Sequence, residues 1–471
     1  MGKPVQVRFL SPVLFADTLD HMSKWSPDSW RSRSASQQAV WPDAFAAQRV
    51  IAEIKELPPL VTSGEVAALK SQLAEAARGE RFVLHGGDCA ESFADCRSSA
   101  ITNQLKMLLQ MSLVLTHASR KRVVRIGRFA GQYAKPRSTD QEVRGGVSLP
   151  SFRGDNVNCP EFTLAARTPN PQLLLRGYER SALTLNFIRA LVDGGFADLH
   201  HPEQWDLDWV VHSPLAGEYK RMVEAIGEGL RFMETLAGVR VHQMQRVDFF
   251  TSHECLLLDL EEAQTRIVPR RDGWWNLSTH FPWLGARTGH IDGAHVEYLR
   301  GIENPIGIKV SGERSPRELV ELCEALNPLR EEGRITLIHR FGARNIAELL
   351  PKFIDAIVTA KIPALWVCDP MHGNTDTVMV HPSSGPPLPV KTRKFGHILA
   401  ELEQAFEVHA MKGSILGGVH FELTGENVTE CTGGARGLVD SDLSRAYQTT
   451  LDPRLNYEQA LEMALLVARR M

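Results

Sequence analysis

Residues 306–370 read IGIKVSGERSPRELVELCEALNPLREEGRITLIHRFGARNIAELLPKFIDAIVTAKIPALWVCDP, and this stretch decides the fold. Three short apolar runs, IGIKV, ITLIH and ALWVC, alternate with two longer segments in which apolar residues recur at helical spacing. Apolar runs of this length indicate buried strands, and the longer periodic segments indicate amphipathic helices. Strands that alternate with helices are typical of a parallel sheet.

The same alternation continues on both sides of this stretch. Apolar runs that predict further strands occur at residues 81–87, 121–131, 241–252, 274–283 and 418–425. Periodic segments that predict helices occur at residues 63–80, 101–119, 173–195, 216–238 and 395–413. Eight strands of this kind predict an α/β protein built on a closed (β/α)8 barrel, the TIM barrel, with an N-terminal extension and additional helices. An open doubly wound sheet is the alternative that the pattern leaves open.

The prediction divides the chain into two parts. Residues 1–60 form an N-terminal arm with short helices, and its Trp25, Trp30 and Trp41 would dock on the barrel or on a second subunit. Residues 61–471 form the barrel, with inserted helices around residues 177–237. Ser63 is the predicted cap of the first long helix. Segments rich in Gly, Pro, Ser and Asn are predicted to be loops, and they are residues 139–160, 166–176 and 375–394.

The composition argues against several classes of function. The chain has 471 residues and a formal net charge of −3, which gives no bulk attraction to nucleic acid or to an anionic membrane. No apolar run approaches the roughly 18 residues that span a bilayer, and the N-terminus shows no cleavage site for export. Seven scattered cysteines favour a reducing compartment. We therefore expect a cytoplasmic protein, without a disulfide between Cys89 and Cys96.

Four separate stretches each contain one side chain that can bind a metal ion. Cys89 lies in FVLHGGDCAES, His372 in ALWVCDPMHGNT, Glu422 in GGVHFELTGENVTEC and Asp452 in TTLDPRLN. The first three follow apolar runs that break into Gly, Asp or Asn, as buried strands do where they enter functional loops. A thiolate, an imidazole and two carboxylates suit a divalent transition ion. Spacing alone leaves open that each residue merely lies at the edge of the core.

Basic side chains occur where the barrel pattern places the same rim. They are Arg128, Lys135, Arg137, Arg287, Lys309 and Arg340. A cation at the end of a buried strand is costly without an anionic partner, and guanidinium groups match phosphate well. Each cation alone fits a structural ion pair, but together they indicate a substrate with several phosphate or carboxylate groups. Glu254 could activate a water molecule near Lys309, or it could instead stabilise the start of a helix.

The motifs of the chain resemble those of the class II (plant-type) 3-deoxy-D-arabino-heptulosonate 7-phosphate (DAHP) synthases. The resemblance runs from about Trp25 to the C-terminus and is carried by WSPDSWRSRSASQQAVWPD, GGDCAESF, GQYAKPRS, SFRGDN, TSHE, IDGAHVEYLRGIENPIGIKVS, DPMHGNT, HFELTGENVTEC and LDPRLN. It implies a TIM barrel that condenses phosphoenolpyruvate with D-erythrose 4-phosphate and releases phosphate. This reaction is the first step of the shikimate pathway.

The resemblance also implies roles for individual residues. A divalent ion, with manganese expected first and cobalt or another ion as alternatives, would be bound by Cys89, His372, Glu422 and Asp452. Phosphoenolpyruvate would be bound by Arg128, Trp283, Arg287, Lys309 and Arg340. Erythrose 4-phosphate would be bound by Lys135, Arg137 and Ser138. The catalytic residues would be Lys309, Glu254 and Arg340. We further expect a homo-oligomer, with association with a chorismate mutase as an additional hypothesis.

The chain departs from the family's usual pattern at several positions. GARTGH at residues 285–290 stands where a GERTRQ-like run is usual, so that Ala286 replaces a glutamate and Gly289 and His290 replace an arginine and a glutamine. Leu451 stands in place of a common cysteine, and His85 in place of a glutamine. These changes suggest a divergent member, and a role in secondary metabolism is one interpretation.

Two alternative functions remain at this point. One is a related synthase with a different acceptor, such as an amino sugar phosphate. The other is a catalytically silent homologue that regulates another enzyme. The intact set of four metal ligands argues against the silent homologue.

Overall fold

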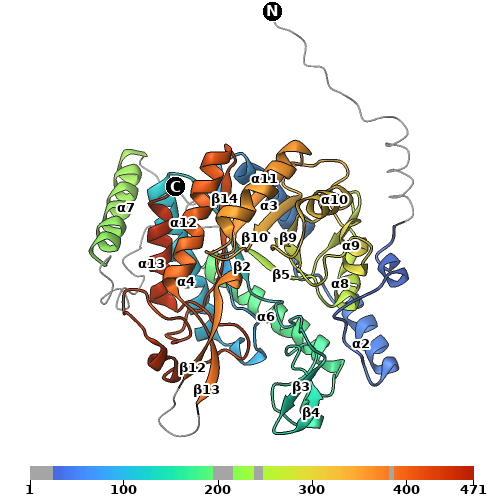
Figure 1. Ribbon diagram of the computed structural model, residues 1–471. Coiled ribbons are helices and arrows are strands. Elements are labelled where there is room, and N and C mark those ends of the chain that lie inside the picture. The colour runs from blue at the N-terminus through green and yellow to red at the C-terminus, as the bar shows by residue number, and fades with distance from the viewer. Residues whose placement is uncertain (1–24, 195–215, 238–247, 381–386) are drawn as a thin grey trace, which may run out of the picture.

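Eight parallel strands close into a barrel (Figure 1). The structure, a computed structural model, describes residues 25–194, 216–237, 248–380 and 387–471. In their order around the barrel, the strands are β1 (Arg81–Gly87), β14 (Leu416–Glu422), β11 (Ala364–Cys368), β10 (Ile335–His339), β9 (Ile306–Val310), β8 (Phe281–Leu284), β5 (Phe250–Glu254) and β2 (Arg122–Arg128). The predicted (β/α)8 barrel is thus confirmed, and the open sheet is excluded.

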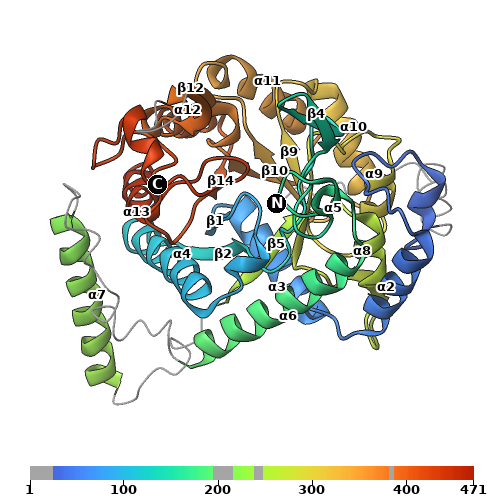
Figure 2. The same cartoon turned by 90° about the horizontal axis from the view of Figure 1, so that it is seen from below.

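Helices surround the barrel, as Figure 2 shows. They are α2 (Ala44–Glu56), α3 (Ser63–Ala77), α4 (Ser98–Ser119), α5 (Leu164–Arg167), α6 (Gln172–Asp193), α7 (Ala216–Ala237), α8 (Leu258–Ala263), α9 (Ala294–Leu299), α10 (Pro316–Leu326), α11 (Ile346–Thr359), α12 (Phe395–Lys412) and α13 (Tyr457–Ala468). Short 3-10 helices occupy Ser29–Ser32, Phe93–Asp95, His372–Asn374 and Asp440–Ser444. Most predicted helices are therefore present with small shifts of their ends.

Helix α3 packs its apolar side chains against the barrel strands. Leu69 and Leu73 are fully buried in one cluster with Val83 and Val124 from β1 and β2. The N-cap of α3 is Thr62 and not the predicted Ser63, because the Thr62 side chain accepts from the backbone of Glu65 in a reciprocal capping box. Helix α3 thus packs against β1, β2, β11 and β14 of the barrel.

The N-terminal segment lies on its own barrel. Trp25 Nε1 donates to the carbonyl oxygen of Glu297 in α9 at 2.8 Å, and Trp30 Nε1 donates to Glu262 Oε2 in α8 at 2.9 Å. Trp41 packs in a smaller cluster beside α2 and α6. Residues 1–24 lie outside the described residues, and the division of the chain at residue 60 stays a prediction.

Two segments that were predicted to be loops form antiparallel hairpins. They are β3 (Gln141–Arg144) with β4 (Val147–Pro150), and β12 (Thr375–Val380) with β13 (Leu388–Arg393). Both project from the end of the barrel where the strands finish (Figure 1). Few of their side chains are buried, so these strands lack the buried apolar run by which the barrel strands are recognised. Of the predicted strand at 241–252, residues 241–247 lie outside the described residues, and β5 begins at Phe250.

The predicted single strand at 274–283 is wrong, because the segment contains two. It splits into β7 (Trp274–Asn276), which pairs with β6 (Thr265–Ile267), and the barrel strand β8. The Asn276 side-chain oxygen accepts from the Ser278 backbone at 2.9 Å and turns the chain between them. All seven cysteines are free, which excludes the Cys89–Cys96 bridge. Among the described residues, no helix has the length and apolar character needed to cross a membrane.

Candidate active site

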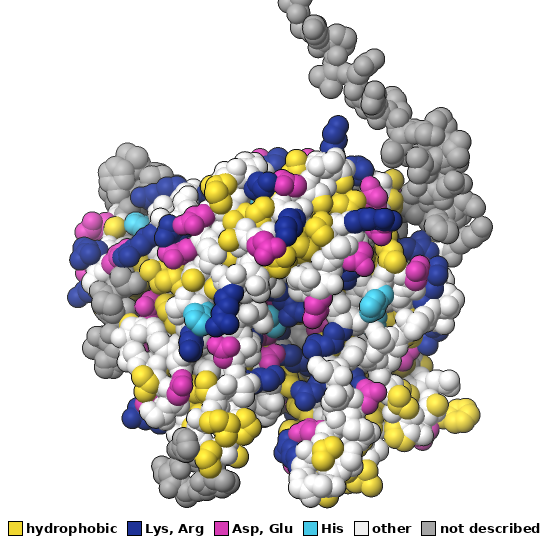
Figure 3. Space-filling model, viewed as in Figure 1, with side chains coloured by type: hydrophobic (Ala, Val, Ile, Leu, Met, Phe, Trp, Pro, Cys, Tyr) yellow, Lys and Arg dark blue, Asp and Glu magenta, His cyan; other side chains and the backbone are white. Residues whose placement is uncertain are grey.

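A cavity of about 220 Å³ opens at the ends of the barrel strands. Its walls include most of the predicted site residues, namely Cys89, Arg128, Lys135, Glu254, Trp283, Arg287, Lys309, Arg340, His372 and Asp452. Figure 3 shows this face hollowed between the two projecting hairpins, with Lys and Arg side chains gathered around the hollow. Residues far apart in the sequence therefore meet at one rim, as the barrel pattern predicted.

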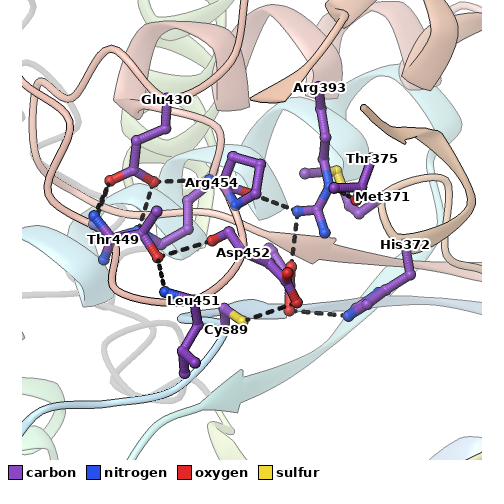
Figure 4. Close-up of polar contacts among 12 residues, drawn as sticks. Cys89, Met371, His372, Thr375, Arg393, Glu430, Thr449, Leu451, Asp452 and Arg454 are labelled. Carbon is purple, nitrogen blue, oxygen red and sulfur yellow. Dashed lines mark hydrogen bonds and ion pairs between the residues drawn. The ribbon is translucent and has the colours of Figure 1, made fainter. Parts of the chain in front are cut away.

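Three of the four predicted metal ligands lie together. One donor atom from each of Cys89, Glu422 and Asp452 lies within 4.8 Å of the others. The fourth, His372, places Nε2 3.1 Å from Glu422 Oε1. Figure 4 shows Cys89, His372 and Asp452 pointing toward one another. The four side chains therefore surround one small volume.

The backbone of β1 explains how Cys89 reaches this position. Gly87 ends the strand with a φ of 147°, a conformation that L side chains rarely adopt. A Cβ at this position would lie 2.9 Å from the carbonyl oxygen of Arg128 on the neighbouring strand. A glycine is therefore required where β1 turns into the loop that carries Cys89.

The donor set fits a divalent cation. Lys135 Nζ contacts both Cys89 Sγ and Asp452 Oδ2, so that a positive charge already stands between these two donors. Asp369 accepts from His372 Nδ1 at 2.7 Å, which leaves Nε2 free to face Glu422. An acceptor that orients a histidine in this way is the usual partner of a metal-binding imidazole. The mixture of sulfur, nitrogen and oxygen favours a transition ion over magnesium or calcium.

The charges around these donors keep the carboxylates ionised. Burial alone would raise the pKa of Asp452, but Lys135 and Arg393 hold it below its ordinary value. Burial likewise opposes ionisation of Glu422, yet His372, Arg393 and Lys135 hold its pKa well below the usual range. Burial raises the pKa of the Cys89 thiol to about 12, so a cation must displace its proton in order to bind.

The predicted anion-binding residues surround an aromatic floor. The guanidinium carbon of Arg128 lies 5.1 Å from the centre of the Trp283 ring, and Lys309 Nζ lies 5.9 Å from it. Arg287 donates to Ser138 Oγ at 3.0 Å. Within the described part of the chain, no carboxylate pairs with Arg287 or Arg340. Their charge is therefore available to an anionic ligand.

Lys309 differs from Arg287 and Arg340 because it has a carboxylate partner. Its Nζ lies 2.6 Å from Asp369 Oδ2. Burial lowers the pKa of Lys309 to about 8, although the neighbouring Asp369 acts in the opposite direction. An ammonium group with such a pKa can give up a proton near neutral pH.

Glu254 ends β5 and is not at the start of a helix, which excludes that alternative interpretation. Its Oε1 is buried without a hydrogen-bond partner in the described chain. A Cβ at Gly285 would lie 2.0 Å from this oxygen, so the glycine makes room for the carboxyl group. Burial raises the pKa of Glu254. These properties suit a general base that accepts a proton within the cavity.

Not every predicted residue faces the cavity. Arg137 does not line it, although Lys135 and Pro136 do. The Arg137 backbone is held at both its N–H and its carbonyl by the side chain of Gln37, at 2.9 and 3.0 Å. The N-terminal segment therefore fixes the loop that carries Lys135.

Several residues of the site were not predicted from the sequence. Arg393 is fully buried and donates to Glu422 Oε2 at 2.7 Å, and Lys391 Nζ lies 2.9 Å from Asp452 Oδ1. Both lie on β13, in a segment whose composition predicts a loop. Asp369 directly follows a buried strand, and this position was the signal that could have identified it.

The departures noted in the sequence fall in different places. Ala286 lines the main cavity, whereas His290 lines a neighbouring one beside α9 and α10. Gly289 lies behind the site, where its carbonyl accepts from Arg314 Nη2 at 2.7 Å. Leu451 lines a third cavity behind Asp452. Only Ala286 can therefore contact a ligand in the main cavity directly.

Comparisons with known proteins agree over nearly the whole chain. A family profile described as the class-II DAHP synthetase family matches residues 25–468. A phospho-2-dehydro-3-deoxyheptonate aldolase of Neurospora crassa is 45% identical over 460 residues, covering 94% of this chain and 94% of that protein. A protein of the same description from Streptomyces coelicolor is 44% identical over 449 residues, covering 95% of this chain and 98% of that protein.

Proposed function

The chain belongs to the class-II DAHP synthetase family, and from this premise we propose which side chains perform its reaction. The protein condenses phosphoenolpyruvate with D-erythrose 4-phosphate to give DAHP and phosphate, the first step of the shikimate pathway. The observation that supports the assignment of roles is the convergence of four metal-competent side chains at a cavity whose wall also carries Arg287 and Arg340, which pair with no carboxylate in the described part of the chain.

We propose that Cys89, His372, Glu422 and Asp452 hold one divalent ion. Manganese is the first candidate, and cobalt is the main alternative because the thiolate is a soft ligand. The bound ion supplies Lewis-acid polarisation of the aldehyde oxygen of the sugar. Asp369 keeps His372 oriented, and Arg393 and Arg128 keep Glu422 ionised and in place.

The cations divide between the two substrates. Arg128, Arg287, Lys309 and Arg340 hold the phosphate and carboxylate groups of phosphoenolpyruvate over Trp283. Lys135 holds the phosphate of erythrose 4-phosphate from the cavity wall, and Arg137 and Ser138 hold it from the same loop outside that wall. The Gln37 contacts support this loop. This arrangement brings the enol carbon next to the aldehyde carbon, so that much of the barrier is overcome by orientation.

Glu254 and Lys309 handle the protons. The enol carbon attacks the aldehyde carbon, and a water molecule then adds to the cationic carbon that bears the phosphate ester. Glu254 accepts a proton from this water, because its raised pKa makes it a competent base. Lys309 donates a proton to the former aldehyde oxygen, on which the attack leaves a negative charge. Arg340 neutralises the phosphate that leaves as the hemiketal collapses.

A homo-oligomer in the cytoplasm is part of the proposal. Val40 and Phe45 near the N-terminus are 83% and 80% exposed, and large exposed apolar side chains of this kind suit a subunit contact. Association with a chorismate mutase is a further proposal that an interaction assay with the purified partner would test.

A related synthase with another acceptor is the second candidate. The observation that favours it is Ala286, which places a small uncharged side chain in the cavity wall. An amino sugar phosphate carries a positive charge and more atoms than erythrose 4-phosphate, so the wall beside Ala286 would decide whether it fits.

The test is a steady-state assay of phosphate release with both substrates, with and without a chelator. We expect turnover with erythrose 4-phosphate that is lost with chelator and restored by manganese. Turnover with an amino sugar phosphate but not with erythrose 4-phosphate would support the second candidate. Full turnover in the presence of chelator, with the purified protein free of metal, would overturn the proposed metal site.

A further inference from the structure

Four side chains inside the barrel form a continuous chain of hydrogen bonds. Arg128 Nη1 lies 3.2 Å from His420 Nε2, and His420 Nδ1 lies 2.9 Å from His85 Nδ1. His85 Nε2 lies 2.7 Å from Ser252 Oγ, and the Ser252 hydroxyl donates to the carbonyl oxygen of Gly127 at 3.2 Å. The chain thus starts and ends on adjacent residues of β2 and passes through β14, β1 and β5. We call it the histidine relay.

The two ends of the relay fix the direction of every hydrogen bond in it. A guanidinium group only donates, so His420 Nε2 accepts and the ring proton of His420 lies on Nδ1. A carbonyl oxygen only accepts, so the Ser252 hydroxyl donates to it and the Ser252 oxygen accepts from His85 Nε2. His85 Nδ1 then accepts from His420. If either ring carried a second proton, two N–H groups would face each other with no acceptor between them.

Burial makes this assignment strict. His85 and His420 are 1% and 0% exposed, and Ser252 is 0% exposed. Solvent therefore cannot replace a missing partner, and an unpaired donor would bear the full cost of desolvation. The rings of Phe281 and Trp283 pack edge-on against His85, with centres 5.6 and 5.5 Å away, so the imidazole has little freedom to turn.

The relay determines which donors of Arg128 remain for a ligand. Nη1 donates to His420 and to Glu422 Oε1 at 3.1 Å, and Nη2 donates to the carbonyl oxygen of Cys89 at 2.7 Å. Of the five N–H donors of a guanidinium group, this leaves the Nε–H and one on Nη2. Arg128 Nε is buried without a partner in the described chain, and Arg128 lines the main cavity. Two such donors match two oxygens of one phosphate or carboxylate group.

We propose that His85 and His420 are positioning residues, which hold Arg128 so that its two remaining donors face the anionic substrate. The inference rests on the proposed binding of phosphoenolpyruvate by Arg128. Neither histidine contacts the substrate, and each acts through the tautomer that the relay imposes on it.

The effect of losing the acceptor at position 85 follows from the same directions. The Nδ1 proton of His420 would then lack a partner in a buried site, and the ring would turn toward another acceptor. Its Nε2 would move away from Arg128 Nη1, and the guanidinium group would lose the acceptor that holds it. Glutamine offers one acceptor and one donor, as a neutral imidazole does, whereas leucine offers neither.

The experiment compares His85→Gln with His85→Leu in the metal-loaded full-length enzyme. We expect His85→Gln to keep the KM for phosphoenolpyruvate within about twofold, and His85→Leu to raise it about tenfold, as expected for one weakened charge-assisted hydrogen bond. The KM for erythrose 4-phosphate stays unchanged in both variants, and the metal content per chain also stays unchanged because Arg393 still pairs with Glu422. A purely structural role would lower thermal stability without moving the KM of one substrate.

His409→Leu is the matched control. His409 is buried on α12, outside the residues that line the main cavity, and its Nδ1 lies 2.7 Å from Ser414 Oγ. The substitution therefore removes an imidazole–hydroxyl contact that is partly buried. It should lower the melting temperature and leave both KM values unchanged. An equal KM for phosphoenolpyruvate in His85→Leu and the unaltered enzyme overturns the positioning role, as does an equal rise in His85→Gln.

Neutron diffraction from substrate-free crystals reads the relay directly. We expect deuterium on His420 Nδ1 and on His85 Nε2, and deuterium on His420 Nε2 overturns the relay. This measurement does not depend on catalysis. If the proposed function is wrong but the relay is right, the enzyme will not turn over phosphoenolpyruvate. The neutron map will still show deuterium on His420 Nδ1 and on His85 Nε2.

Discussion

The ammonium group of Lys309 lies 2.6 Å from the carboxylate of Asp369 at the rim of the barrel. The same carboxylate accepts from the ring of His372 at 2.7 Å. One buried acid thus connects the proposed proton donor with a proposed metal ligand. Because Asp369 contacts both Lys309 and His372, it holds the proposed proton donor close to the proposed metal site.

This contact leads to a prediction about pH. Burial lowers the pKa of Lys309 to about 8, while Asp369 opposes the shift. The protonated form is the donor, so kcat/KM is retained at lower pH and falls as the pH rises through about 8. Lys309→Arg stays charged at all these pH values, and we expect this variant to be slower and to lack the alkaline fall. Persistence of the same fall in Lys309→Arg would assign it to another group.

A second prediction concerns the space beside Glu254. In Gly285→Ala, the added Cβ would lie 2.0 Å from Glu254 Oε1, so the carboxyl group must move away from its position. We expect kcat to fall by about tenfold or more, since a displaced base loses most of its contribution. The control is Gly396→Ala, because a Cβ there meets nothing within 4 Å. Equal kcat values in the two variants would show that the reaction does not depend on the position of the Glu254 carboxyl group.

Arg393 provides a prediction about stability. Its buried guanidinium donates to Glu422 Oε2 at 2.7 Å and also to the backbone of Pro453. Arg393→Met leaves part of a buried carboxylate uncompensated, and we expect the free energy of unfolding to fall by about 3 kcal/mol. Denaturant unfolding of the metal-free protein measures this change.

The control for Arg393 is an exposed ion pair. Arg317 lies 2.8 Å from Glu321, and its side chain is 89% exposed. Arg317→Met should leave the free energy of unfolding nearly unchanged, because solvent screens an exposed ion pair. A similar loss in both variants would mean that the buried contact of Arg393 contributes no more to the free energy of unfolding than an exposed ion pair does.

The sequence predicted the barrel and its rim because both depend on local pattern. Buried strands are short apolar runs, and Gly87 and Asp369 interrupt such runs where the chain enters the cavity. The ligands Cys89, His372 and Glu422 follow or end these strands. Their common position at one rim therefore follows from the parallel arrangement of the strands.

The remaining features depend on contacts that local pattern does not encode. The hairpin of β12 and β13 has few buried side chains, and its Pro and Ser residues resemble a loop, so Arg393 was not considered. The direction of the Arg128 donors depends on His420 and His85, which lie on different strands. Only the folded barrel brings these groups within hydrogen-bonding distance.

The most direct test of the metal site is anomalous X-ray diffraction at the manganese absorption edge from crystals grown with Mn²⁺. We predict one anomalous peak per chain, bonded to Cys89 Sγ, His372 Nε2 and the carboxylates of Glu422 and Asp452. In crystals of Cys89→Ser, the peak should weaken or vanish. A peak located away from Cys89, or one of undiminished height in Cys89→Ser, would contradict the account.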